Sequence, residues 1–172
     1  MFDFEYKPLK LDLNPKEHTQ LYARFSKEIS SLFIQCNNVK LEKINKNCII
    51  TLNYNNNNYI FELHHTFPFN KPIKILVNNI NYNRILCDDN DNDKIIPYIK
   101  KYSGSECLCC KSITCEPNWS PATRITSIIN EIELNLIIKY KIQINILCDK
   151  IREKYNCSSQ YGNFLNIEDY LF

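Results

Sequence analysis

Three short stretches in the first half of the chain alternate apolar and polar residues with a period of two. They lie at residues 39–42, 48–52 and 59–63. Successive side chains of a β-strand point to opposite faces of a sheet, so this pattern predicts three strands with one buried face. Residues 55–58 are four consecutive asparagines, which tolerate the positive φ of a hairpin turn. The stretches therefore predict an antiparallel meander, and residues 73–77 extend it to four strands.

The strands are expected to share their buried face with helices. The side chains that should meet those helices are Ile50, Leu52, Phe61 and Leu63. An N-terminal helix is predicted to run to about residue 34, because Asn14 can cap its first turn and Pro15 needs no N–H at the first helical position. Its apolar residues recur at helical spacing: Leu21, Phe25, Ile29 and Leu32. Residues 1–13 alternate apolar and polar side chains and predict a short strand or an extended arm.

Residues 88–93 are all aspartate or asparagine, like the start of a calcium-binding loop. Counted from Asp89, however, the sixth position is Lys94 and the twelfth is Lys100. A calcium loop of this type needs glycine and glutamate at those positions. We therefore expect a solvated insertion without calcium, followed by a short helical or irregular piece up to residue 102.

A long helix is predicted for the C-terminal part of the chain. Ser120 followed by Pro121 has the pattern of an N-cap and a first helical residue. Apolar residues then keep helical spacing to about residue 155, and neither glycine nor proline interrupts them, so helix is favoured over strand. The aromatic residues of 156–172 are expected to fold back on the body of the protein.

Composition limits the class of protein. A chain of 172 residues with a net charge of +2 is long enough for a single domain, and its mixed charges do not suggest a nucleic-acid groove. No apolar run approaches a membrane span, and the first residues do not resemble a secretory leader, so we expect cytoplasm or nucleus. Thiols stay reduced there, and nine cysteines, an odd number, also argue against a disulfide framework. The excess of asparagine and isoleucine indicates an AT-rich genome, such as that of a large DNA virus or a protist.

The stretch from residue 104 to residue 122 holds the densest group of reactive side chains. It contains one of the two glycines, the only tryptophan and four cysteines: Cys107, Cys109, Cys110 and Cys115. A thiol just after a glycine turn can be a nucleophile. A Cys-x-x-Cys pair such as Cys107 and Cys110 can instead bind zinc, with Cys109 and Cys115 completing four thiolates. Buried cysteines can also simply pack in a core. All three interpretations remain open at this point.

Two segments resemble the ubiquitin-conjugating enzyme family. Phe67-Pro68-Phe69-Asn70-Lys71-Pro72 is similar to the family's Tyr-Pro-Phe-x-x-Pro segment before the last meander strand. Gly104-x-x-Cys107-Leu108, followed by Trp119-Ser120-Pro121-Ala122, is similar to its active-site cysteine and the Trp-x-Pro segment that opens the next helix. The resemblance covers roughly residues 15–138, and residues 139–172 are expected to form a divergent helical tail. It implies an α+β fold with an N-terminal helix, a four-stranded antiparallel meander, an irregular cysteine-bearing loop and C-terminal helices.

The resemblance also implies an activity. A cysteine of the family accepts ubiquitin as a thioester from an activating enzyme and passes it to a lysine, usually with a ligase bound. Cys107 is the first choice for this acceptor and Cys109 the second. The family places an asparagine about eight residues before its cysteine to stabilise the oxyanion. Residues 93–106 contain no asparagine, so the candidates are Asn83 and Asn92.

The resemblance further implies partners and leaves two alternatives. Residues at the positions of Phe69, Pro121 and Ala122 dock the ligase in the family. One alternative is an inactive domain of the same fold that binds ubiquitin or another protein. The other is a structural virion or assembly protein, located in a virus or a host cell, whose loop is held by cysteines or by zinc. We expect neither a nucleic-acid nor a membrane partner.

Overall fold

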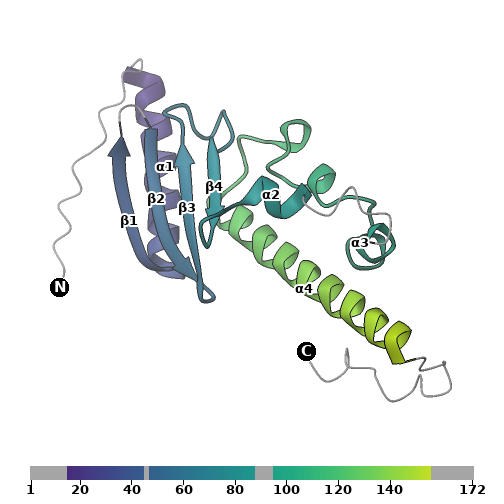
Figure 1. Cartoon of the computed structure of the whole chain (residues 1–172). Helices are drawn as coiled ribbons and strands as arrows, with labels where there is room; N and C mark the ends of the chain where they lie inside the picture. The colour runs from purple at the N-terminus through teal and green to yellow at the C-terminus, as the bar shows by residue number, and fades with distance from the viewer. Residues whose placement is uncertain (1–14, 45–46, 88–94, 156–172) are drawn as a thin grey trace.

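The computed structural model describes residues 15–44, 47–87 and 95–155 (Figure 1). The protein has an α+β architecture in which an antiparallel sheet is accompanied by helices. In chain order the elements are α1 (Pro15–Gln35), β1 (Asn37–Ile44), β2 (Asn47–Tyr54), β3 (Asn57–Leu63), β4 (Lys74–Val77), β5 (Ile80–Asn81), α2 (Tyr82–Cys87), α3 (Ile96–Ser103), the 3-10 turns η1 (Cys109–Lys111) and η2 (Glu116–Asn118), and α4 (Ile125–Tyr155).

The sheet is a meander of five strands in the order β1-β2-β3-β4-β5, with all neighbours antiparallel. The four predicted strands are present, and β5 adds a fifth strand of two residues. Asn55 and Asn56 form the β2–β3 turn with φ values of 45° and 63°, as the asparagine run predicts. Asn78 and Asn79 form a second such turn between β4 and β5, with φ values of 50° and 67°. This second turn was not predicted.

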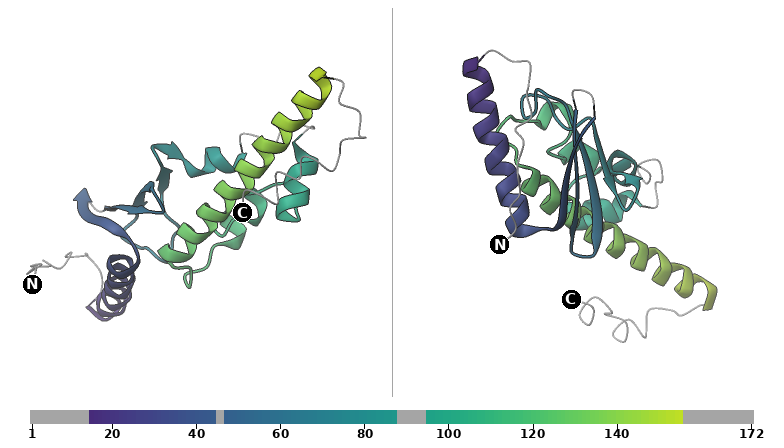
Figure 2. Two further views of the ribbon diagram at one scale, coloured as in Figure 1. Left: turned by 90° about the horizontal axis from the view of Figure 1, so that it is seen from below. Right: turned by 90° about the vertical axis from the view of Figure 1, so that its left-hand side faces the viewer.

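The core lies between the sheet and two helices that pack on the same face. The predicted inward residues Ile50, Leu52, Phe61 and Leu63 are at most 1% exposed. They meet apolar residues of α1 and of the first turns of α4: Ile29, Leu32, Ile125, Ile128, Ile129 and Ile132. The two helices are joined where the Ile125 N–H donates to the Glu28 carboxylate over 3.1 Å. Figure 2 shows α1 on one side of the sheet and α4 extending beyond it.

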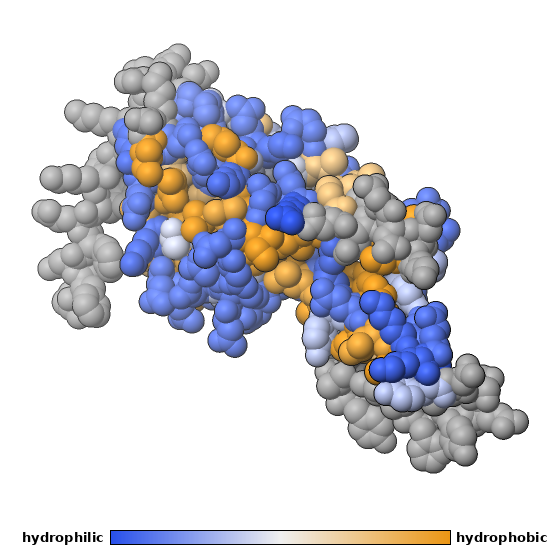
Figure 3. All heavy atoms as spheres, viewed as in Figure 1, coloured by the Kyte–Doolittle hydropathy of each residue, from blue (hydrophilic) through white to orange (hydrophobic). Residues whose placement is uncertain are grey.

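The opposite face of the sheet is turned toward the viewer in Figure 3, where apolar residues are bordered by hydrophilic ones. Ile49, Ile60 and Leu76 are partly buried on this face. Ile60 pairs with Leu76 across β3 and β4. Beyond the sheet, α4 also carries exposed apolar residues, among them Leu147 and Tyr155.

One prediction about the helices needs correction. The last helix begins at Ile125 and not at Pro121. The Ser120 hydroxyl accepts the Ala122 N–H over 3.1 Å and the Ser120 carbonyl accepts the Thr123 N–H over 2.8 Å, so these residues form a turn before the helix. Serine often competes with a helix in this way. The short helix α2 was not predicted, whereas α3 occupies the place of the expected helical piece.

The long helix itself is confirmed, since α4 runs without interruption through 31 residues to Tyr155. No described helix has both the length and the apolar character required to cross a membrane. The predictions for residues 1–13, 88–93 and 156–172 fall outside the described residues.

Candidate cysteine site

The cysteine-bearing loop, residues 104–119, follows α3 and lies against α4. Gly104 ends α3 in the left-handed conformation, with φ at 68°, and its N–H donates to the Lys100 carbonyl over 2.9 Å. Glycine is the usual residue at such a helix end because it has no Cβ to clash. The Ser105 hydroxyl then donates to the Cys107 carbonyl over 2.9 Å. The glycine turn and the Ser105 hydrogen bond thus fix the backbone of Cys107 in the segment just before η1.

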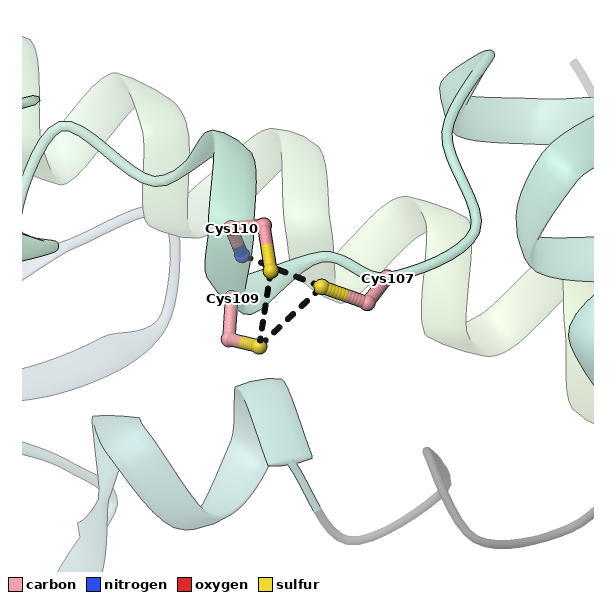
Figure 4. Close-up of side chains that lie close together, drawn as sticks. All are labelled: Cys107, Cys109 and Cys110. Carbon is pink, nitrogen blue, oxygen red and sulfur yellow. Dashed lines mark hydrogen bonds between the residues drawn. The ribbon is translucent and has the colours of Figure 1, made fainter.

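Three of the four cysteines in this loop form a cluster (Figure 4). The Cys107 and Cys109 sulfurs are 3.2 Å apart, and those of Cys109 and Cys110 are 3.9 Å apart. The Cys110 backbone N–H also donates to the Cys107 sulfur over 3.1 Å. A disulfide bond measures about 2.05 Å, so no disulfide joins these three cysteines. All three sulfurs lie within 4.8 Å of one another, and the cluster could hold a metal ion.

The three thiols differ in exposure, and Cys107 and Cys110 also differ in acidity. Cys107 and Cys109 are half-buried, whereas Cys110 is exposed. Burial raises the pKa of the Cys107 thiol, but hydrogen bonds from Cys110 and Cys109 lower it by more, so that its pKa lies below the usual value. The contact with Cys107 raises the pKa of the Cys110 thiol. Cys107 is therefore the member of this pair that loses its proton more readily.

Cys115, the fourth predicted zinc ligand, is not part of the cluster. It stands at the start of η2, and its N–H donates to the Ser112 carbonyl over 3.0 Å. Asn118 fixes the same bend, because its side-chain amide donates to the carbonyls of Cys110 and Ser112 over 2.8 and 3.0 Å. The structure thus brings together three of the four predicted thiols.

One carboxylate on α4 holds this region in place. Glu131 accepts hydrogen bonds from the Tyr82 hydroxyl over 2.7 Å, the Ser112 hydroxyl over 2.6 Å and the Ile113 N–H over 2.7 Å. Burial, followed by the charge of Glu131, raises the pKa of Tyr82. Glu131 therefore connects α2 and the cysteine-bearing loop to α4. A cavity of about 250 Å³ lies beside it, and Glu131, Asn135 and side chains from the loop line that cavity.

Of the two asparagines predicted as oxyanion donors, one bonds within its own segment and the other lies outside the described residues. Asn83 is exposed on α2, where its N–H donates to the Asn81 side chain over 2.9 Å. It lines a small cleft with Lys71 and Thr114. Asn92 lies outside the described residues.

The predicted partner-binding residues lie at the surface, on two segments that touch. Phe69 is 62% exposed, and Pro121 and Ala122 are exposed as well. The Trp119 indole N–H donates to the Pro68 carbonyl over 3.1 Å, and the Phe67 and Trp119 ring centroids are 6.1 Å apart. An ion pair of 2.9 Å between Lys71 and Glu116 joins the same two segments.

The structure shows a thiol that is more exposed than Cys107 and that the sequence analysis did not consider, that of Cys87. Cys87 is exposed at the C-terminal end of α2. Counting back eight residues from Cys87 reaches Asn79, which is exposed in the β4–β5 turn. The spacing of asparagine and cysteine, applied to every cysteine and not only to those of the loop, would have found this pair.

Comparisons of the chain with models of known families, with curated proteins and with solved structures gave no match.

Proposed function

We propose that the protein is a divergent ubiquitin-conjugating-type enzyme, which carries ubiquitin or a ubiquitin-like protein as a thioester and transfers it to a lysine. The observation that carries this proposal is the contact between the two segments on which the resemblance rests. Pro68 and Trp119 are 51 residues apart in sequence, yet a hydrogen bond of 3.1 Å joins them. The order of α1, meander, cysteine-bearing loop and long helix also agrees with the order that the resemblance implies.

Cys87 is the better candidate for the acceptor, although the sequence alone favoured Cys107. An acceptor thiol must be reached by two large proteins in turn, and Cys87 is exposed. Cys107 is instead a half-buried residue, and its sulfur is in contact with the Cys109 thiol. Asn79 also stands eight residues before Cys87, at the separation that the resemblance implies for the oxyanion donor. Cys107 is retained as the alternative acceptor.

The proposed chemistry uses one thiol and one amide. The Cys87 thiolate attacks the carbonyl carbon of the modifier bound to the activating enzyme. A new C–S bond forms, the C–S bond to the activating enzyme breaks, and the thiolate of that enzyme leaves. A lysine amine of the substrate then attacks the same carbonyl, loses a proton to solvent, and releases the Cys87 thiolate as an amide forms. The oxyanion of this step needs a hydrogen-bond donor, for which Asn79 is the candidate from its spacing in the sequence alone. Loss of one such donor typically lowers the rate by roughly 10²–10³.

The surface formed by Phe69, Pro121 and Ala122 is the proposed site for a ligase. An exposed phenylalanine is a suitable anchor for a partner protein, because aromatic side chains dominate the binding energy of many interfaces. The Trp119–Pro68 hydrogen bond and the Lys71–Glu116 ion pair fix the two segments relative to each other. Phe69→Ala should weaken ligase-dependent transfer while leaving thioester formation intact.

The proposal is tested by incubating the full chain with activating enzyme, ATP and ubiquitin, followed by gel electrophoresis without reductant. The wild type should form an adduct that reductant removes. Cys87→Ser should form a more stable ester, whereas Cys107→Ser and the control Cys36→Ser should keep the reducible adduct. If Cys107→Ser alone abolishes the reducible adduct, Cys107 is the acceptor. If no activating enzyme charges the wild type but ubiquitin still binds, the protein is a binding domain.

A structural zinc ion in the cysteine-bearing loop is a second candidate role, and the three-thiol cluster is the observation that favours it. Thiolates are preferred ligands of zinc, and a structural zinc stabilises a loop that has little apolar core of its own. Metal analysis of protein purified without chelators should find one zinc per chain. An absence of metal under these conditions would remove this role but would not affect the acyl-carrier proposal.

A further inference from the structure

We infer that Cys107, Cys109 and Cys110 form a three-thiolate site for a soft metal ion whose remaining coordination position faces solvent. This inference rests on the metal-binding role of the loop and specifies its coordination. It is independent of the acyl-carrier function. It differs from a closed four-cysteine zinc site because Cys115 is not a ligand and because an external ligand can enter.

The sulfur positions fit a single ion. With a metal–sulfur bond of about 2.3 Å, tetrahedral geometry places neighbouring sulfurs about 3.8 Å apart. The two measured separations are 3.2 Å and 3.9 Å, and all three sulfurs lie within 4.8 Å. Small rotations of the side chains would therefore bring all three sulfurs to bonding distance. In Figure 4 the three side chains point toward one another from η1 and from the segment before it.

The backbone around the cluster is held in place without a metal. The Cys110 N–H donates to the Cys107 sulfur over 3.1 Å, a contact of the kind that supports metal-bound thiolates. The carbonyl of Cys107 accepts from Ser105 over 2.9 Å, and that of Cys110 accepts from Asn118 over 2.8 Å. Little chain entropy would then be lost on binding, because the ligating residues already occupy one arrangement.

The fourth position is open for two reasons. Cys110 is exposed, so one side of the cluster faces water. Cys115 is kept apart by its place at the start of η2, which is anchored through the Lys71–Glu116 ion pair and the Trp119–Pro68 hydrogen bond. Among the described residues, no further histidine, cysteine or acidic side chain joins the three sulfurs. Closed structural zinc sites have four protein ligands, whereas sites with three protein ligands accept water or another molecule.

The ligand class follows from the donors. Three thiolates select soft ions, so the site should take zinc or cuprous copper and should not retain magnesium or calcium. The open position should accept a small thiol as a fourth ligand. Metal at this site should consequently exchange with chelators more readily than metal in a closed four-thiolate site.

The test is titration of the full chain, under anaerobic conditions, with Co²⁺ as a spectroscopic substitute for zinc. Thiolate-to-cobalt charge-transfer absorption scales with the number of bound thiolates. Cys107→Ser, Cys109→Ser and Cys110→Ser should each lower this absorption and weaken binding by about tenfold or more. Cys115→Ser and the remote control Cys36→Ser should change the affinity by less than about twofold. Adding a small thiol to the loaded wild type should raise the absorption by about one third, as three thiolates become four.

Two results would overturn the inference, and they are distinguishable. If Cys115→Ser lowers the absorption and the affinity as much as Cys107→Ser does, the site is a closed four-cysteine site and the metal-binding role stands without the open position. If neither Co²⁺ nor Zn²⁺ binds the wild type, the metal-binding role fails as well. Because Cys87 is not a ligand, Cys87→Ser should bind metal like the wild type. This variant separates the metal site from the acyl-carrier proposal.

Discussion

The sheet half and the cysteine half of the molecule are held together in different ways. The sheet, α1 and the first turns of α4 share a continuous apolar core in which Leu52, Tyr59 and Phe61 are fully buried. The helix α2 and the cysteine-bearing loop reach this core through Tyr82, Leu86 and Leu108. They are held in addition by directed polar contacts that converge on Glu131 of α4. Apolar burial is spread over many side chains and leaves a periodic pattern in the sequence. A single carboxylate leaves no such pattern, although its loss would affect the whole loop.

The largest effect is expected in the apolar half. Phe61→Ala removes a fully buried aromatic side chain, so it should lower the free energy of unfolding by about 3–5 kcal/mol. The matched control is Phe69→Ala, which removes the same side chain from an exposed position and should change stability by about 0.5 kcal/mol or less. Denaturant unfolding measures both. An equal decrease in the free energy of unfolding for Phe61→Ala and Phe69→Ala would contradict the burial of Phe61 in the core.

An intermediate effect is expected at Glu131. Glu131→Ala leaves three donors without their charged acceptor and should cost roughly 1.5–3 kcal/mol. The effect should be local, so amide hydrogen exchange at Ile113 should become fast while the amides of β2 and β3 stay protected. The control Glu133→Ala removes a carboxylate that binds Asn57 and Tyr59 in the sheet half, and should leave Ile113 protected. If Glu131→Ala instead speeds amide exchange equally at Ile113 and in β2 and β3, the loop does not open separately from the sheet.

A smaller effect is expected where the two family-like segments meet. Trp119→Phe keeps an aromatic ring against Phe67 but removes the N–H that donates to Pro68. Loss of one hydrogen bond of this kind should cost about 0.5–1.5 kcal/mol in the free energy of unfolding. A loss of more than about 3 kcal/mol in the free energy of unfolding would show that the indole stabilises the protein mainly by packing and not by this hydrogen bond.

The smallest effect is expected at Glu28, a polar contact inside the apolar half. Burial raises the pKa of Glu28, and the Ile125 N–H and nearby arginines offset this only in part. A raised pKa in the folded state means that protonation favours folding, and this contribution is lost as the pH rises through the folded-state pKa. Glu28→Gln keeps the acceptor for Ile125 and removes the charge. It should raise stability at pH 7 by about 0.5 kcal/mol or less, and this gain should vanish at a pH below the ordinary range of glutamate. A loss of stability at pH 7 would show that the charge itself stabilises the α1–α4 contact.

The sequence predicted the sheet half well because its signals are local and repeated. Alternation in β2 and β3 identified both the strands and the buried face, and the asparagines at 55 and 56 identified the turn. The cysteine half was predicted less well. The start of α4 was placed too early because Ser120 and Pro121 satisfy a helix-start pattern while their hydrogen bonds form a turn. Which three of the four thiols approach one another depends on η1 and η2, and neither turn has a periodic signal in the sequence.

The central claim is that the thiol that carries a modifier and the thiols that bind metal are different cysteines. Native mass spectrometry of the full chain, charged with ubiquitin in the presence of zinc, tests it directly. The predicted species carries one ubiquitin and one zinc together, and hydroxylamine, which cleaves thioesters, should remove the ubiquitin and leave the zinc. If ubiquitin and zinc never occur on the same molecule although each binds separately, the acceptor belongs to the cluster of Cys107, Cys109 and Cys110, and the claim is wrong.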